Sequence, residues 1–233
     1  MKNRLKSVLA LLSAIILLGA CQKDSLSGGQ LSYVFKPTNL AASVGTTTAA
    51  SGLVVAANSN GSMTWTSGTL NVQKVQLSAK KDQVATSFEY SNLTNIDILN
   101  TGTVSGSVSL PDGTYDAIEI KLNLVQSNTN VPLVLKGTYT ETSGTKIPVE
   151  VQFNEAYDLK LNPPQLVIKG DKYTANVTLD LTKMMTGLVA NDLGQTTRTQ
   201  PNNTILVTSS INAALYAKLK ANLLLVPSVL IAK

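Results

Sequence analysis

Apolar side chains recur at every second position over long stretches of this chain, which leaves few folds open to it. Between residues 147 and 153 every second residue is apolar, and the residues between them are polar or proline. Residues 173–181 repeat the pattern with threonine at many of the polar positions. Because successive side chains of a β-strand point to opposite faces, these segments predict strands with one buried and one solvated face. Such strands are typical of two-layer antiparallel folds.

Turn-forming residues separate the predicted strands. They include Asn128–Asn130, Ser143-Gly144 and Gly170-Asp171. Short strands separated by turns at intervals of about ten residues favour a β-sandwich over repeated βαβ units.

Two of the predicted strands change phase partway along. Apolar residues at Leu70 and Val72 give way to the opposite parity from Val75 onward, and a similar change follows Tyr115. Since an unbroken strand would turn its apolar set to solvent, each change predicts a β-bulge. We place these bulges near Lys74 and Ala117.

Other segments depart from the alternation. Residues 38–62 are small and polar around a short apolar run, and predict a loop. A short helix is expected near 182–187, ended by Gly187, and a strand over 204–208. Apolar residues spaced by four predict a second helix over 211–224, with Ser210 as its N-cap and its end before Pro227.

The N-terminus has the pattern of a secretion signal. Three basic residues precede an apolar run from Val8 to Leu18, which is too short to span a bilayer core of about 20 residues. Leu18-Gly-Ala-Cys21 follows and resembles the bacterial lipobox, in which the cysteine becomes lipidated. The alternative is an ordinary signal peptide with an unrelated cysteine. We predict a signal peptide over 1–20, a lipid on Cys21, and a polar tether over 21–30.

The composition excludes several classes of function. The chain of 233 residues has no histidine and one cysteine, so it lacks the residues for a Ser-His-Asp triad, a disulfide or a Cys/His zinc site. Three basic residues and no acid lie in 1–20, so their removal lowers the formal net charge from +5 to +2. No basic patch indicates nucleic acid, and we expect no cofactor.

The residues after Cys21 carry two further signals. Gln22-Lys-Asp24 is similar to surface-export signals of Bacteroidetes lipoproteins, and Asp24-Ser25-Leu26 resembles the sequon that is O-glycosylated in that phylum. A plain solvated linker is the alternative interpretation.

Two stretches of the body resemble an uncharacterised family of Bacteroidetes outer-membrane lipoproteins. They are Trp65–Val75 and Ile96–Ile118, the second containing Leu110-Pro-Asp-Gly-Thr-Tyr-Asp-Ala-Ile118. The resemblance spans residues 63–125, with a weaker part over 166–181. It implies a β-sandwich lipoprotein for which carbohydrate binding is often suggested, and it transfers no catalytic residue.

The turn in that motif also has a local explanation. Pro111 favours a turn position, Asp112 can bond to the backbone, and Gly113 permits positive φ. Tyr115 would then enter the core, with its hydroxyl bonded to a backbone carbonyl as in a tyrosine corner. The alternative is that Asp112 and Tyr115 contact a ligand.

Three other groups of residues are candidates for chemistry. Asp112, Asp116 and Glu119 form the densest acidic group, followed by Glu150 and Glu155, but spacing alone places no pair across a cleft, as a glycosidase requires. Asn58–Gly61 resembles half of a calcium loop without the carboxylates, so we assign no metal. Trp65 is either a core residue or a platform for a sugar ring.

We therefore expect a mainly β chain, with residues 31–233 forming an antiparallel β-sandwich, immunoglobulin-like or transthyretin-like, and a C-terminal helix. The expected function is a non-enzymatic binding module for glycans or another envelope component. The module would be held by Cys21 at the outer membrane, on the cell surface, with Trp65, Asp112 and Tyr115 as candidate ligand residues. The alternative is an assembly subunit that pairs with a partner protein through a strand edge. An enzyme acting on surface polysaccharide ranks third.

Overall fold

The computed structural model describes residues 28–45, 61–100 and 104–233, without the side chains of residues 90–92, 104 and 105. The signal peptide, Cys21 and Ser25 lie outside these ranges, as do residues 46–60 of the predicted loop. No helix in the described ranges has the length and hydropathy needed to cross a bilayer.

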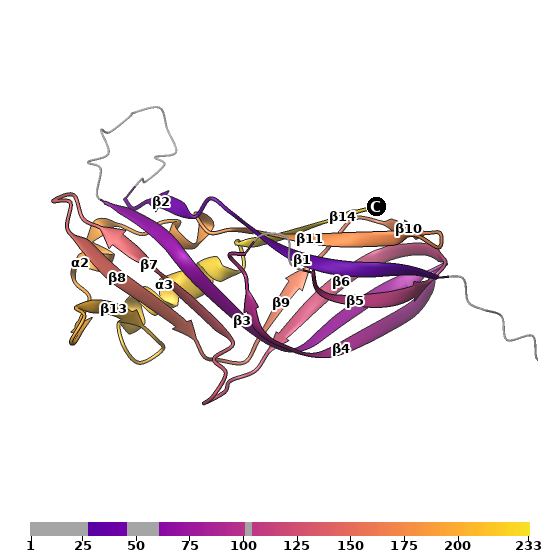
Figure 1. Cartoon of the computed structure of the whole chain (residues 1–233), viewed down its shortest axis with the longest axis horizontal. Helices are drawn as coiled ribbons and strands as arrows, with labels where there is room; N and C mark the ends of the chain where they lie inside the picture. The colour runs from indigo at the N-terminus through magenta and orange to yellow at the C-terminus, as the bar shows by residue number, and fades with distance from the viewer. Residues whose placement is uncertain (1–27, 46–60, 101–103) are drawn as a thin grey trace, which may run out of the picture.

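The described chain is mainly β and forms two sheets (Figure 1). The smaller sheet has the order β14-β11-β1-β5, with bounds Pro227–Ala232, Lys172–Asp180, Gly28–Thr38 and Val104–Pro111. The larger has the order β10-β6-β3-β7-β8-β13-β12, with bounds Leu166–Ile168, Gly113–Leu124, Ser62–Lys81, Leu133–Thr140, Lys146–Phe153, Thr204–Val207 and Arg198–Thr199. Three more strands join it: β2 (Ala41–Ser43) and β4 (Val84–Asp97) pair with β3, and β9 (Tyr157–Leu161) pairs with β6.

Most pairings are antiparallel, as the alternation predicts, but two are parallel. β1 pairs in parallel with β11, and β13 pairs in parallel with β8. Both pairs join segments far apart in the sequence. The alternation of apolar residues indicates which face of a strand is buried and favours an antiparallel sheet in general, but it does not fix the direction of any one pair, so it could not predict these two pairings.

Strand β3 has 20 residues and runs through both parts of the molecule. Its residues 62–70 pair with β7, and its residues 74–81 pair with β6. In Figure 1 the smaller sheet lies beside the β4 and β6 part of the larger sheet, while β7, β8 and β13 lie at the other end with the helices. β3 therefore connects a region of facing strands to a region where helices lie beside the sheet.

The helices in the described ranges are short. They are η2 (Lys183–Met185), α2 (Ala190–Gly194) and α3 (Ala213–Leu223). α3 buries Leu215, Tyr216, Leu219 and Leu223, and the Tyr216 ring lies 5.5 Å from that of Phe153 in β8. Burial of one apolar face, rather than helix propensity, is what stabilises a helix of this length.

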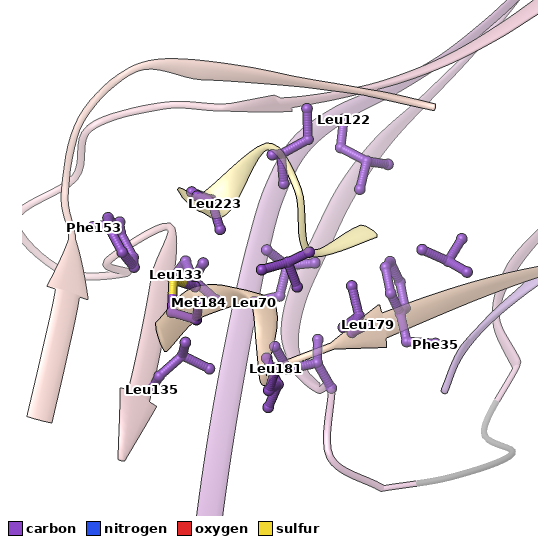
Figure 2. Packing of buried hydrophobic residues seen from close by; sticks show 14 of the residues in the cluster. Phe35, Leu70, Leu122, Leu133, Leu135, Phe153, Leu179, Leu181, Met184 and Leu223 are labelled. Atoms are coloured by element: carbon purple, nitrogen blue, oxygen red, sulfur yellow. The ribbon is translucent and has the colours of Figure 1, made fainter. Parts of the chain in front are cut away.

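Both sheets and α3 share one hydrophobic core (Figure 2). At their junction a cavity of about 30 Å³ is lined only by apolar side chains, including Phe35, Leu70, Leu122, Leu179 and Leu223. A cavity with no polar wall atom does not hold water stably, and this one is too small for an organic ligand. It is part of the packing of the core.

One of the two predicted bulges is confirmed. Ser78 pairs with Glu119 and Lys80 with Asp116, so β6 has one residue more than β3 between these pairs. Ala117 lies in this interval with φ of 48°, in the left-handed region. The additional residue keeps the apolar set of β6 on the buried face.

The bulge predicted near Lys74 is wrong in position. Pairing with β4 is regular from Val72 to Val75, and the nearest register shift lies between Leu70 and Val72. The additional residue there is in β4. The change in the buried parity of β3 coincides with its change of partner from β7 to β6. A further register shift, between Trp65 and Ser67 against β7, was not predicted.

The ends of the domain also differ from prediction. β1 begins at Gly28, so residues 28–30 belong to a strand and not to the tether predicted over 21–30. α3 begins at Ala213, and the residue before it is Asn212 rather than Ser210. The Asn212 side chain donates to the carbonyls of Thr197 and Leu206, which are contacts that only the tertiary fold supplies. α2 and β14 were not predicted.

Candidate functional site

A polar hollow of about 270 Å³ lies where β3 changes its partner strand. The last β7 pair on β3 is Leu70–Leu133 and the first β6 pair is Lys74–Asn123, so residues 71–73 have no ladder partner on that side. The connection from β6 to β7 passes beside this interval. The hollow is lined by Asn71, Val72, Gln73, Thr94, Val125, Gln126, Ser127 and Asn130.

Asn71 holds the two sides of the hollow in place. Its Nδ2 donates to the carbonyl of Val131 at 2.8 Å, and its Oδ1 accepts from the backbone N–H of Asn95 at 2.7 Å. Its own backbone N–H donates to the carbonyl of Pro132 at 2.8 Å. One side chain therefore ties β3 both to β4 and to the β6–β7 connection.

Ser127 fixes the shape of that connection. Its Oγ accepts from the backbone N–H groups of Thr129 and Asn130 at 3.2 and 3.0 Å, a local turn of the kind serine favours. Its backbone N–H donates to Oδ1 of Asn154 at 2.9 Å. The β6–β7 connection is thus held by bonds that do not use the side chains of the other polar residues of the hollow.

Four lining side chains keep their hydrogen-bonding groups available. Gln73, Thr94, Gln126 and Asn130 are exposed, and within the described ranges none of them bonds through its side chain to another protein group. Each amide offers two donors and a carbonyl acceptor. Since none of the described residues that line the hollow is charged, the site suits an uncharged polar ligand.

Trp65, a candidate for sugar stacking, lies in the core. Its side chain is 2% exposed on the same face of β3 as Met63. The indole N–H has no acceptor among the described residues. A ligand could not reach the ring without opening the core.

Tyr115 and Asp112 join neighbouring turns. The Tyr115 hydroxyl donates to the carbonyl of Pro111 at 2.7 Å, and the ring is 1% exposed. Burial, with the charges of Asp82 and Asp112, raises the pKa of Tyr115 above its usual value. Oδ1 of Asp112 accepts from the backbone N–H of Gly170 at 2.7 Å. These contacts give both residues a structural role in the turns.

Each of the other candidate acids is bonded to a cation or an amide. Asp116 accepts from the side chains of Gln83 and Gln165, and Glu119 pairs with Lys160 at 3.2 Å. Glu150 pairs with Lys136 at 3.3 Å, and Glu155 pairs with Lys220. These contacts are ordinary for surface acids.

No group of three or more metal-ligating side chains occurs in the part of the chain that the structure describes. Asn58–Asn60 of the calcium-like motif, Cys21 and Ser25 lie outside that part.

The hollow was not predicted from the sequence. Asn71 and Gln73 have the pattern of outward strand residues, and Gln126–Asn130 that of a turn. The one signal was the phase change of β3 near Lys74, which marks the partner change that creates the hollow. It could not indicate that residues 125–130 lie beside it.

Comparison of the chain with known protein families, with curated proteins and with solved structures found no match.

Proposed function

We propose that this protein is a lipid-anchored, non-enzymatic binding module of the outer membrane, facing the cell surface, and that it binds uncharged glycans in the hollow at the β3 partner change. The observation that carries the proposal is a hollow whose described lining includes four residues with available polar side chains and no charged residue. Amide and hydroxyl groups match the alternating donors and acceptors of sugar hydroxyls.

The scaffold supports this role because the hollow is built from fixed parts. Asn71 and Ser127 bond to the backbone and leave Gln73, Gln126 and Asn130 to a ligand. A preformed site loses little conformational freedom on binding. The residues that line it include no aromatic ring, so we expect weak binding to each sugar unit, strengthened when many anchored copies meet a repeating polymer.

The anchoring part of the proposal rests on the Leu18–Cys21 motif and on the resemblance to Bacteroidetes lipoproteins. β1 begins seven residues after Cys21, which leaves a short tether between the lipid and the domain. The same resemblance is the basis for proposing a sandwich related to the immunoglobulin-like or transthyretin-like type.

Binding of the protein to a panel of neutral polysaccharides tests the glycan site. We expect the double change Gln73→Ala with Gln126→Ala to weaken binding at least about tenfold, since two bonding side chains are lost. Gln195→Ala removes an exposed glutamine beyond α2 and is the matched control. Equal loss in both variants, or binding to no polysaccharide, would contradict the proposal.

Protease treatment of intact cells tests the anchor and its orientation. We expect the wild-type protein to be digested from outside, and Cys21→Ser to be lost from the outer-membrane fraction. Protection until the outer membrane is opened would place the domain in the periplasm.

A second candidate, assembly with a partner protein, is favoured by the edge strand β14. It carries no charged residue, has β11 as its one partner among the described strands, and exposes 62% of Leu230. Uncharged edges favour pairing with another chain. Co-purification of one stoichiometric partner that is lost in Leu230→Lys and kept in Val84→Lys would support this candidate.

A further inference from the structure

One exposed valine distinguishes the hollow from a purely polar one. Val125, the residue after β6, is 38% exposed, whereas the Val72 side chain is 2% exposed and packs in the core. Val125 is followed in the sequence by Gln126, and both residues line the hollow. An apolar contact therefore lies next to an available amide on the segment that follows β6.

A ligand group that matches this arrangement carries an amide and a methyl together. A glutamine amide can donate to an amide carbonyl and accept from an amide N–H. A methyl group gains from contact with a valine side chain that excludes water from it. A sugar hydroxyl at the same position would satisfy the amide but leave the valine without an apolar partner.

We propose that the hollow recognises the acetamido group of an N-acetylated, uncharged sugar, through Gln73 or Gln126 and the side chain of Val125. The inference rests on the proposed glycan-binding function and names the ligand class of that site. The volume of about 270 Å³ is just below the lower bound of roughly 300 Å³ for pockets that take larger ligands, which suits a short glycan unit.

Titration of the protein with two matched probes tests the inference. Chitotriose and cellotriose have the same β1,4-linked backbone and differ in acetamido or hydroxyl groups at C2. We expect chitotriose to bind about tenfold more tightly, the size expected for one added hydrogen bond and one buried methyl group.

The variant Val125→Thr keeps the shape of the side chain and replaces one methyl by a hydroxyl. We expect it to reduce the preference for chitotriose to about threefold or less while leaving cellotriose affinity unchanged. Val84→Thr alters an exposed valine at the β3–β4 turn and should leave both affinities unchanged.

The outcomes separate this inference from the function on which it rests. Equal binding of the two probes, or an unchanged preference in Val125→Thr, overturns the acetamido inference while glycan binding stands. Failure of both probes and of all neutral polysaccharides overturns both. If chitotriose is preferred, competition with peptidoglycan and with an N-acetylated surface polysaccharide shows which source displaces it.

Discussion

The hydroxyl of Tyr115 donates a 2.7 Å hydrogen bond to the carbonyl oxygen of Pro111, four residues earlier. This bond closes the turn between β5 and β6, and the ring of Tyr115 is buried in the core. The sequence Pro-Asp-Gly-Thr-Tyr therefore contains both the turn and the contact that stabilises it.

Tyr115→Phe should lower the free energy of unfolding by about 1–2 kcal/mol, because the Pro111 carbonyl loses its donor while the core keeps its ring. Urea unfolding measures the change. Tyr157→Phe removes a hydroxyl for which the described residues offer no bonded partner, and should change stability by less than about 0.5 kcal/mol. Loss of glycan binding without loss of stability in Tyr115→Phe would favour a ligand role for this residue.

Trp65→Ala should destabilise the fold by about 3–5 kcal/mol, since it empties a fully buried site beside Met63. Trp65→Phe should cost less and leave glycan binding intact. The indole emission of the wild-type protein should not change when ligand is added. A ligand-dependent change in that emission would show that the ring lies nearer the binding site than its burial indicates.

Ala117→Gly should raise the free energy of unfolding by about 0.5–1 kcal/mol, because glycine removes the penalty of φ 48° at the bulge. Ala85→Gly is the matched control on an exposed, regularly paired position of β4, and should lower stability by a similar amount. If the two variants change the free energy of unfolding in opposite directions, the bulge is verified in solution. A change in the same direction in both variants would contradict it.

Stability should fall in acid partly through Glu155. A hydrogen bond from Lys220, assisted by Tyr216 and the Lys220 charge and opposed by burial, lowers the pKa of the Glu155 carboxyl. The folded state thus favours the ionised form. This contribution is complete above the unfolded pKa of about 4.3 and is lost as the pH falls through the lower folded-state pKa.

Denaturation between pH 7 and pH 2 measures this effect. Glu155→Gln should be less stable than wild type at pH 7 and should lose less stability below about pH 4. Lys220→Gln should also reduce the loss of stability in acid, because the Glu155 carboxyl then loses its cationic donor. Parallel curves for all three proteins would rule out this linkage. Burial and the neighbouring Glu155 carboxylate raise the pKa of Tyr216 to about 12, so this tyrosine stays protonated throughout.

The β character of the chain could be predicted because it is a local property. Alternating apolar residues specify a buried face wherever the strand lies, and the confirmed bulge at Ala117 followed from the same rule. α3 lies within the predicted range because its apolar spacing matches the helical period. Positions that depend on a distant partner were missed: Asn212 precedes α3 because its side chain bonds to Thr197 and Leu206.

By itself, the sequence determined which residues of the alternating segments face the core and that a lipobox-like motif precedes the domain, and it favoured the closure of the Pro111–Tyr115 turn. These features depend on residues within a few positions of one another. Only the tertiary structure decided that β1 and β11 run in parallel, that Trp65 is enclosed, and that β3 leaves β7 for β6 after Leu70. The hollow exists because that partner change leaves a gap in the ladder between segments about 50 residues apart, and such long-range pairing has no local signature in the chain.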